Sequence, residues 1–233
     1  MGQHIVSAFD DDLVSVQAQI SEMGGLCEDL LTNALVAVQN RDAQLAAEVI
    51  ARDKKLDALE MELEEIATRT IALRQPMAQD LRILISALKI ASTLERIGDL
   101  AKNISKRAIY LSSARPVKLS SSLVRMGQQT LGQLTEVLDA YSSRDTEKAV
   151  SVWRRDVEID DVYNAIFREI LTYMMEDPRM IGLGSQLLFI AKNLERIGDH
   201  VTHVSEMIYY IVEGEPLGDE RPKGEPIALE FEG

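Results

Sequence analysis

Four pairs of acidic residues in this 233-residue chain have members four positions apart, and they recur at matching places in two copies of one sequence pattern. The pairs are Asp53 with Asp57, Glu95 with Asp99, Asp156 with Asp160, and Glu195 with Asp199. On a helix, residues i and i+4 lie one turn apart on the same face, so the two carboxylates of a pair can converge on one point. Hard divalent or trivalent cations take oxygen ligands of this kind. The spacing therefore predicts eight metal-ligating carboxylates.

One such pair alone indicates little, because a chain with 38 acidic residues contains roughly six of them by chance, most on solvated helix faces. Like charges at this spacing also destabilise a bare helix by about 0.2–0.5 kcal/mol per pair. The recurrence of both pairs in both copies favours a bound cation that removes the repulsion, and a solvated acidic surface is the alternative. All-oxygen ligation suits iron, manganese or magnesium, and suits zinc less.

Three neighbouring residues bear on the same site. Gly98 and Gly198 stand between the acids of a pair, where glycine costs about 1 kcal/mol relative to alanine in a helix. They indicate either a close approach of two helices or room for a metal cluster. His203 lies four residues after Asp199 and is a further candidate ligand, although its counterpart in the other copy is Asn103.

The acidic pairs belong to an internal duplication. Residues 90–99 and 190–199 agree at eight of ten positions, with an offset of 100, and both segments end in Leu-Glu-Arg-Ile-Gly-Asp. Upstream, the segments 41–57 and 144–160 match at an offset of 103. A period near 100 residues indicates a duplicated domain rather than a solenoid repeat.

Prolines and apolar spacing predict the helices that carry these residues. The six prolines interrupt any helical pattern, and they stand at positions 76, 116, 178, 216, 222 and 226. Between them apolar residues recur every three or four positions, which predicts apolar helix faces such as Leu81, Leu84, Ile85, Leu88, Ala91 and Leu94. Asp42 and Asp145 are expected to cap helix N-termini. The expected helices span residues 9–39, 42–73, 77–112, 119–142, 145–175 and 180–212.

These elements predict an all-α fold of two tandem three-helix bundles related by internal duplication. The first bundle is expected at residues 9–114 and the second at 117–213. Each bundle carries its acidic pairs on its second and third helices, which pack side by side. Residues 214–233 show no apolar periodicity, and they are expected to form a disordered tail.

Composition narrows the class of protein. The net charge of −13 disfavours a nucleic-acid partner and direct adhesion to an anionic membrane. No apolar run approaches the roughly 18 residues needed to cross a bilayer, and the N-terminus lacks a signal-peptide pattern. The single cysteine, Cys27, excludes an intrachain disulfide and is expected to be buried beside Leu26 and Leu30. A cytoplasmic protein is therefore expected, and its exposed helical faces favour a homodimer.

The repeated Glu-Arg-Ile-Gly-Asp motifs resemble the PhoU family, as do Arg74-Gln75-Pro76, Asp80-Leu81-Arg82 and the segment 171–177, Leu-Thr-Tyr-Met-Met-Glu-Asp. The similarity covers residues 10–213. It implies two tandem three-helix bundles with an acid-x-x-x-Asp metal motif on two helices of each, and these motifs map onto the eight acidic residues above. Leu100 stands where many relatives have a polar or histidine residue, so the resemblance does not require identical metal occupancy of the two copies.

The same resemblance implies a negative regulator of the phosphate-starvation response. Such a regulator links the ATPase of a phosphate ABC transporter to a phosphate-sensor histidine kinase, and these protein partners recruit it to the inner face of the membrane. Modulation of phosphate uptake is implied as well.

Two alternatives stay open. A carboxylate-bridged metal enzyme would need Glu-x-x-His motifs, and none of His4, His200 and His203 stands three residues after a glutamate. A metal-free helical adaptor would share the fold and differ only in metal content. The sequence shows no Gly-rich phosphate loop and no Ser or Cys nucleophile with a nearby histidine base, so an enzyme is not expected.

Overall fold

The structure is a computed structural model that describes residues 2–114 and 121–218. Most of the predicted tail, from residue 219 on, lies outside the described residues. Within them the chain forms α-helices, one 3₁₀ turn and no strand, in the order α1 (Gly2–Asn40), α2 (Ala43–Arg74), α3 (Gln79–Ser113), α4 (Ser121–Ser143), α5 (Thr146–Glu176), η1 (Pro178–Met180) and α6 (Ile181–Glu213). The all-α prediction is confirmed, and the helix ends agree within two residues except at α1. That helix begins at Gly2 rather than at residue 9. No proline stands before Pro76, so none interrupts the helix in this part of the chain.

The turn between the first two helices is the same in both copies. Asp42 and Asp145 cap α2 and α5, since their side-chain oxygens accept backbone N–H groups of the first turn. The residues before them, Arg41 and Arg144, have left-handed backbone angles with φ of 56° and 54°. Both predicted caps are confirmed, and the duplication extends to the backbone conformation of this turn.

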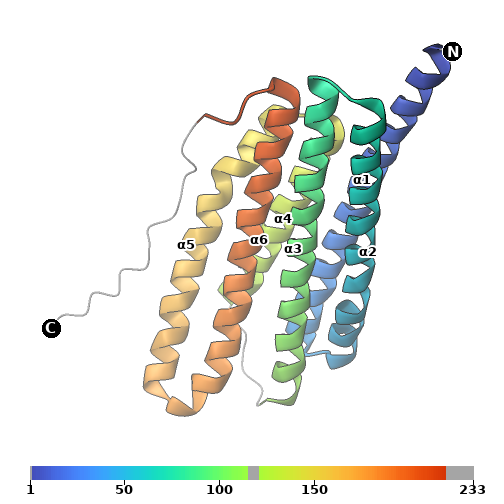
Figure 1. Cartoon of the computed structure of the whole chain (residues 1–233). Coiled ribbons are helices and arrows are strands. Elements are labelled where there is room, and N and C mark those ends of the chain that lie inside the picture. The colour runs from blue at the N-terminus through green and yellow to red at the C-terminus, as the bar shows by residue number, and fades with distance from the viewer. Residues whose placement is uncertain (1, 115–120, 219–233) are drawn as a thin grey trace.

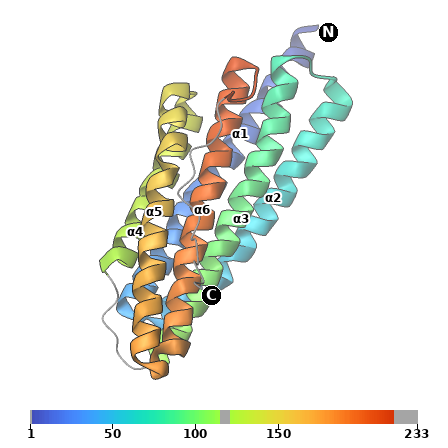
Figure 2. The same cartoon turned by 90° about the vertical axis from the view of Figure 1, so that its left-hand side faces the viewer.

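The helices run along one common axis, and α2, α3, α6 and α5 follow one another across Figure 1 with α1 and α4 behind them. Helix α3 packs against α1 and α2, α6 packs against α4 and α5, and α3 also packs against α6. The α2–α3 connection and the α5–α6 connection lie at opposite ends of the molecule (Figures 1 and 2), so the two copies are antiparallel to each other. Among the described helices none has a stretch long and apolar enough to cross a membrane.

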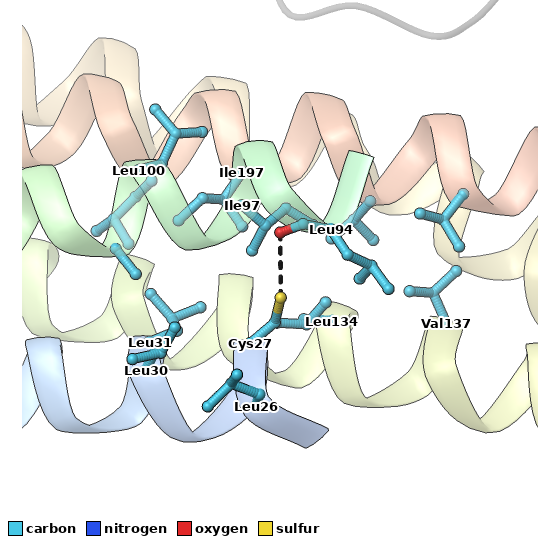
Figure 3. Close-up of a cluster of buried hydrophobic side chains, with 14 of the residues drawn as sticks. Leu26, Cys27, Leu30, Leu31, Leu94, Ile97, Leu100, Leu134, Val137 and Ile197 are labelled. Atoms are coloured by element: carbon cyan, nitrogen blue, oxygen red, sulfur yellow. Dashed lines mark hydrogen bonds between the residues drawn. The ribbon is translucent and has the colours of Figure 1, made fainter. Parts of the chain in front are cut away.

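One apolar core joins the two copies. Leu94 and Ile97 of α3, Leu134 of α4 and Ile197 of α6 are fully buried in one cluster (Figure 3). Cys27 of α1 lies in the same cluster, and its thiol donates a hydrogen bond of 3.1 Å to the backbone oxygen of Leu94. The predicted burial of Cys27 is confirmed. Because the core is continuous, the two three-helix bundles are parts of one packed body.

The apolar face predicted for the start of α3 is wrong in part. Leu84, Ala91 and Leu94 are fully buried, but Leu81 and Ile85 each keep 37% of their surface exposed. The spacing of apolar residues does not specify which side of a broad apolar stripe packs against other helices. At this end of α3, the side that carries Leu84 is packed and the side that carries Leu81 and Ile85 is partly exposed.

Candidate metal centre

The acidic pairs lie along two helix–helix seams. The first seam runs between α2 and α3, and the second runs between α5 and α6. We define the seams by their carboxylates, which are Asp53, Asp57, Glu95 and Asp99 in the first and Asp156, Asp160, Glu195 and Asp199 in the second. Each seam thus draws two carboxylates from each of its helices, as the internal duplication predicts.

In the first seam, a lysine bridges the two helices. The ammonium of Lys102 on α3 lies 2.5 Å from Asp53 Oδ2 on α2 and 2.5 Å from Asp99 Oδ1 on α3. Asp53 is 3% exposed, whereas Asp57 faces solvent. The structure therefore brings Asp53 and Asp99 together around one cation and leaves Asp57 at the surface.

The charges of the first seam depend on one another. Burial raises the pKa of Asp53, while the hydrogen bond and charge of Lys102 oppose that rise. Burial acts in the same direction on Asp99, but there the Lys102 hydrogen bond and charge prevail, and the pKa of Asp99 falls. Burial, and then the negative charge of Asp99, raises the pKa of Glu95 to about 7. Burial also acts to lower the pKa of Lys102, but its hydrogen bonds with Asp53 and Asp99 raise it overall, so Lys102 is a cation at neutral pH.

The second seam has acidic residues of the same types at the corresponding positions, but its lysine, Lys192, comes from a different position. Asp156 is 1% exposed on α5, and Glu195 on α6 is mostly buried. Burial raises the pKa of Glu195, and the charges of Asp199 and Asp160 add to that rise, so these carboxylates are electrostatic neighbours. Lys192 contacts Glu195 at 2.6 Å from the outer side of the seam, where nearly half of the lysine side chain is exposed.

The two glycines make room for side chains of the facing helix, which are Leu56 at Gly98 and Asp156 at Gly198. A Cβ atom placed on Gly198 would lie 2.8 Å from Asp156 Oδ1, and one placed on Gly98 would lie 3.4 Å from Asp53 Oδ1 and overlap Leu56. Separations under 3.0 Å require one group to move. The glycines thus allow the two helices of each seam to approach closely, around Leu56 in the first and Asp156 in the second, which agrees with the first of the two roles that their positions indicate.

Gly198→Ala is expected to lower the free energy of unfolding by about 1 kcal/mol, because a cost of overpacking of about 1–3 kcal/mol outweighs the helix propensity gained. Gly25 is the matched control, since it stands exposed within α1 and a Cβ there meets nothing within 4 Å. Gly25→Ala should raise the stability by about 0.5–1 kcal/mol. Urea denaturation followed by circular dichroism in the presence of EDTA measures both. An equal gain in the two variants would show that Gly198 does not hold the seam open.

Sequence reasoning missed Lys102, although a signal for it was present. Lys102 stands three residues after Asp99, within helical reach, and its counterpart in the second copy is the uncharged Thr202. The candidate ligand His203 lies with Nδ1 3.4 Å from Glu206, which also accepts a hydrogen bond from the indole of Trp153. His203 is therefore engaged by a carboxylate outside the predicted set.

A metal ion fits the two seams unequally. Nowhere in residues 2–114 and 121–218 do three Asp, Glu, His or Cys side chains lie together as a preformed ligand group, so the carboxylates of either seam would have to converge on an ion. The second seam offers the right donors, four carboxylates with a buried aspartate beside Gly198, and Asp156, Asp160, Glu195 and Asp199 would hold the ion there. The first seam fits poorly, because Lys102 already contacts two of its four carboxylates.

These features define a class of protein: an all-α protein built from two antiparallel copies of a three-helix unit, with an acidic seam between the second and third helices of each copy. The sequence matches the PhoU domain twice, at residues 20–108 and 123–208. The chain belongs to the PhoU family.

Known relatives are similar over nearly the whole chain. A protein of Caulobacter vibrioides named phosphate-specific transport system accessory protein PhoU homolog is 50% identical over 224 residues, which are 96% of this chain and 97% of the relative. A protein of Rhizobium meliloti with the same name is 51% identical over 94% of this chain and 93% of its own length. The crystal structure of PhoU from Pseudomonas aeruginosa superposes with a TM-score of 0.86 at 37% identity, covering 89% of this chain and all of the other.

Proposed function

We propose that this protein is a negative regulator of the phosphate-starvation response that acts as an accessory protein of phosphate transport and modulates phosphate uptake. The observation that carries the proposal is the 50% identity, over 96% of the chain, with a protein named as an accessory protein of the phosphate-specific transport system. A structural relative from Streptococcus pneumoniae, 30% identical with a TM-score of 0.84, is named as a phosphate transport system regulatory protein.

The proposed mode of action is that of an adaptor. The partners are the ATPase of a phosphate ABC transporter and a phosphate-sensor histidine kinase, which the adaptor holds inactive when phosphate is plentiful. The protein would act in the cytoplasm, held at the inner face of the membrane by these partners, as a homodimer. The long exposed sides of the helix bundle supply surface for such contacts, and a net charge of −13 favours recruitment through proteins over binding to anionic lipid.

Metal binding is part of the same proposal. Asp156, Asp160, Glu195 and Asp199 would hold iron, manganese or magnesium through carboxylate oxygens. Burial raises the pKa of Glu195, and the negative charges of Asp199 and Asp160 add to the rise; a cation bound there would offset those charges and would tie α5 to α6.

Loss of the gene tests the regulatory role. In phosphate-rich medium, a deletion strain should express a phosphate-starvation reporter that the parent strain keeps silent, and a plasmid-borne copy of the gene should silence it again. Capture of the purified kinase and transporter ATPase on the immobilised protein then tests the adaptor contacts. A deletion strain that still silences the reporter would contradict the proposed regulation, and capture of neither partner would contradict the adaptor mechanism.

Removing the second-seam carboxylates tests metal binding. The variant Asp156→Asn, Asp160→Asn, Glu195→Gln, Asp199→Asn is expected to lose metal content by at least about tenfold, because no charged oxygen ligand remains in that seam. A control with the same change of net charge replaces four exposed glutamates, Glu48, Glu62, Glu65 and Glu158, with glutamine. Elemental analysis after incubation with iron, manganese or magnesium measures both. Metal lost equally from the control, or never bound by the parent, would favour a metal-free adaptor.

A further inference from the structure

The duplication allows the two seams to be compared position by position, and they differ in the positively charged residue that each contains. Lys102 on α3 corresponds to Thr202 on α6, at the offset of 100 that relates the two Leu-Glu-Arg-Ile-Gly-Asp motifs. Both residues stand three positions after the last aspartate of their motif. Lys102 brings a positive charge into its seam, whereas Thr202 is buried and donates its hydroxyl to the backbone oxygen of Asp199 at 2.7 Å.

The contacts of Lys102 are those that a metal ion would make. Its ammonium approaches one carboxylate from each helix, Asp53 from α2 and Asp99 from α3, at 2.5 Å each. Only 22% of the lysine side chain and 4% of the Asp53 side chain are exposed, so this pair is shielded from solvent. A divalent ion placed between the same carboxylates would have to displace the ammonium or lie against a like charge beside the buried Asp53.

The second seam places its lysine differently. Lys192 corresponds to Ser92 of the first copy. Its ammonium forms an ion pair with Glu195 and lies 5.2 Å from the centre of the Tyr163 ring. It projects from the outer side, with 46% of its side chain exposed. Its contacts are thus with Glu195 and Tyr163 at the outer side of the seam, whereas Lys102 joins carboxylates of both helices of the first seam.

We propose that Lys102 is a built-in cation of the first seam, which takes the place of a metal ion between Asp53 and Asp99 and confines metal binding to the second seam. The inference rests on the proposed metal binding for its second half only. The proposal predicts one metal site and one internal ion pair in place of two equivalent metal sites. Only the second copy would then bind metal as its concentration rises.

Exchanging the two residues tests the proposal. Mn²⁺ bound per chain is measured by equilibrium dialysis and elemental analysis for the parent, Lys102→Thr, Thr202→Lys, and the double exchange. Lys102→Thr should bind about twice as much Mn²⁺ as the parent, and Thr202→Lys should bind at least about tenfold less. The double exchange should return to the parental amount. Lys106→Thr, which removes an exposed lysine one turn further along α3, is the matched control and should leave the amount unchanged.

A second measurement does not depend on the folding of the exchanged variants. Replacing the first-seam carboxylates, by Asp53→Asn, Asp57→Asn, Glu95→Gln and Asp99→Asn, should leave the Mn²⁺ content unchanged. A loss of about half would instead show two equivalent sites and overturn the proposal.

The outcomes separate this proposal from the proposed function. If the parent binds Mn²⁺ and Lys102→Thr binds no more, the role of Lys102 is wrong and the metal-binding function stands. If the parent binds none and Lys102→Thr gains a site, the role of Lys102 stands and the second-seam metal site is wrong. If neither binds Mn²⁺, both are overturned.

Discussion

Leu94→Ala is expected to lower the free energy of unfolding by about 3 kcal/mol, because the substitution removes a fully buried side chain and the tightly packed surroundings close the cavity only in part. Leu94 lies where α1, α3, α4 and α6 meet, among the side chains of Figure 3. Its loss therefore weakens both copies at once, and the variant should unfold in a single transition at a lower concentration of urea.

Leu73→Ala is the matched control, since the same chemical change at a residue that is 72% exposed should alter the stability by less than about 0.5 kcal/mol. Urea denaturation followed by circular dichroism and by the fluorescence of Trp153, the only tryptophan, measures both variants. Trp153 lies in the second copy and Leu94 in the first. Separate transitions for the two signals would show that the copies unfold independently, contrary to the shared core.

Alkaline pH is expected to destabilise the protein through Cys27. Burial strongly raises the pKa of this thiol above its usual value of 9.0, and the charge of Asp53 adds to the rise. Above pH 9 the thiol ionises in the unfolded chain but keeps its proton in the folded one, so stability falls as pH rises. The loss is about 1.4 kcal/mol per pH unit, or about 2 kcal/mol between pH 9 and pH 10.5.

Cys27→Ala isolates this contribution, because alanine has no proton to lose. The parent should lose about 2 kcal/mol more than Cys27→Ala between pH 9 and pH 10.5 in parallel urea titrations. Tyr141, whose pKa burial raises to about 12, contributes in the same direction in both proteins and cancels from the difference. Equal pH dependence in the two proteins would mean that the thiol is not held protonated by the fold.

The proposed asymmetry of the seams would make the two copies differ in their response to metal. In the first seam Lys102 forms ion pairs with Asp53 on α2 and with Asp99 on α3. If the second seam alone takes up an ion, then metal changes the contact between α5 and α6 and leaves that between α2 and α3 alone. The two copies share one apolar core.

Much of this protein was predictable from local patterns. Prolines and apolar spacing predicted the helices, because helix periodicity and proline sterics act over a few residues. Asp42 and Asp145 were recognisable as caps for the same reason. The duplicated motifs predicted which helices carry the acidic residues and the glycines between them, since i and i+4 spacing specifies a helix face without reference to the rest of the chain.

The sequence by itself therefore determined the helices, the duplication and the residues of the two seams, all of which depend on near neighbours. Only the tertiary structure decided that Asp53 is buried while Asp57 is exposed, and that Lys102 meets an aspartate 49 positions earlier in the chain. It also decided that α3 packs on α6, so that two repeats share one core. These features depend on which helix faces meet in space, and periodicity along one helix does not specify its partner.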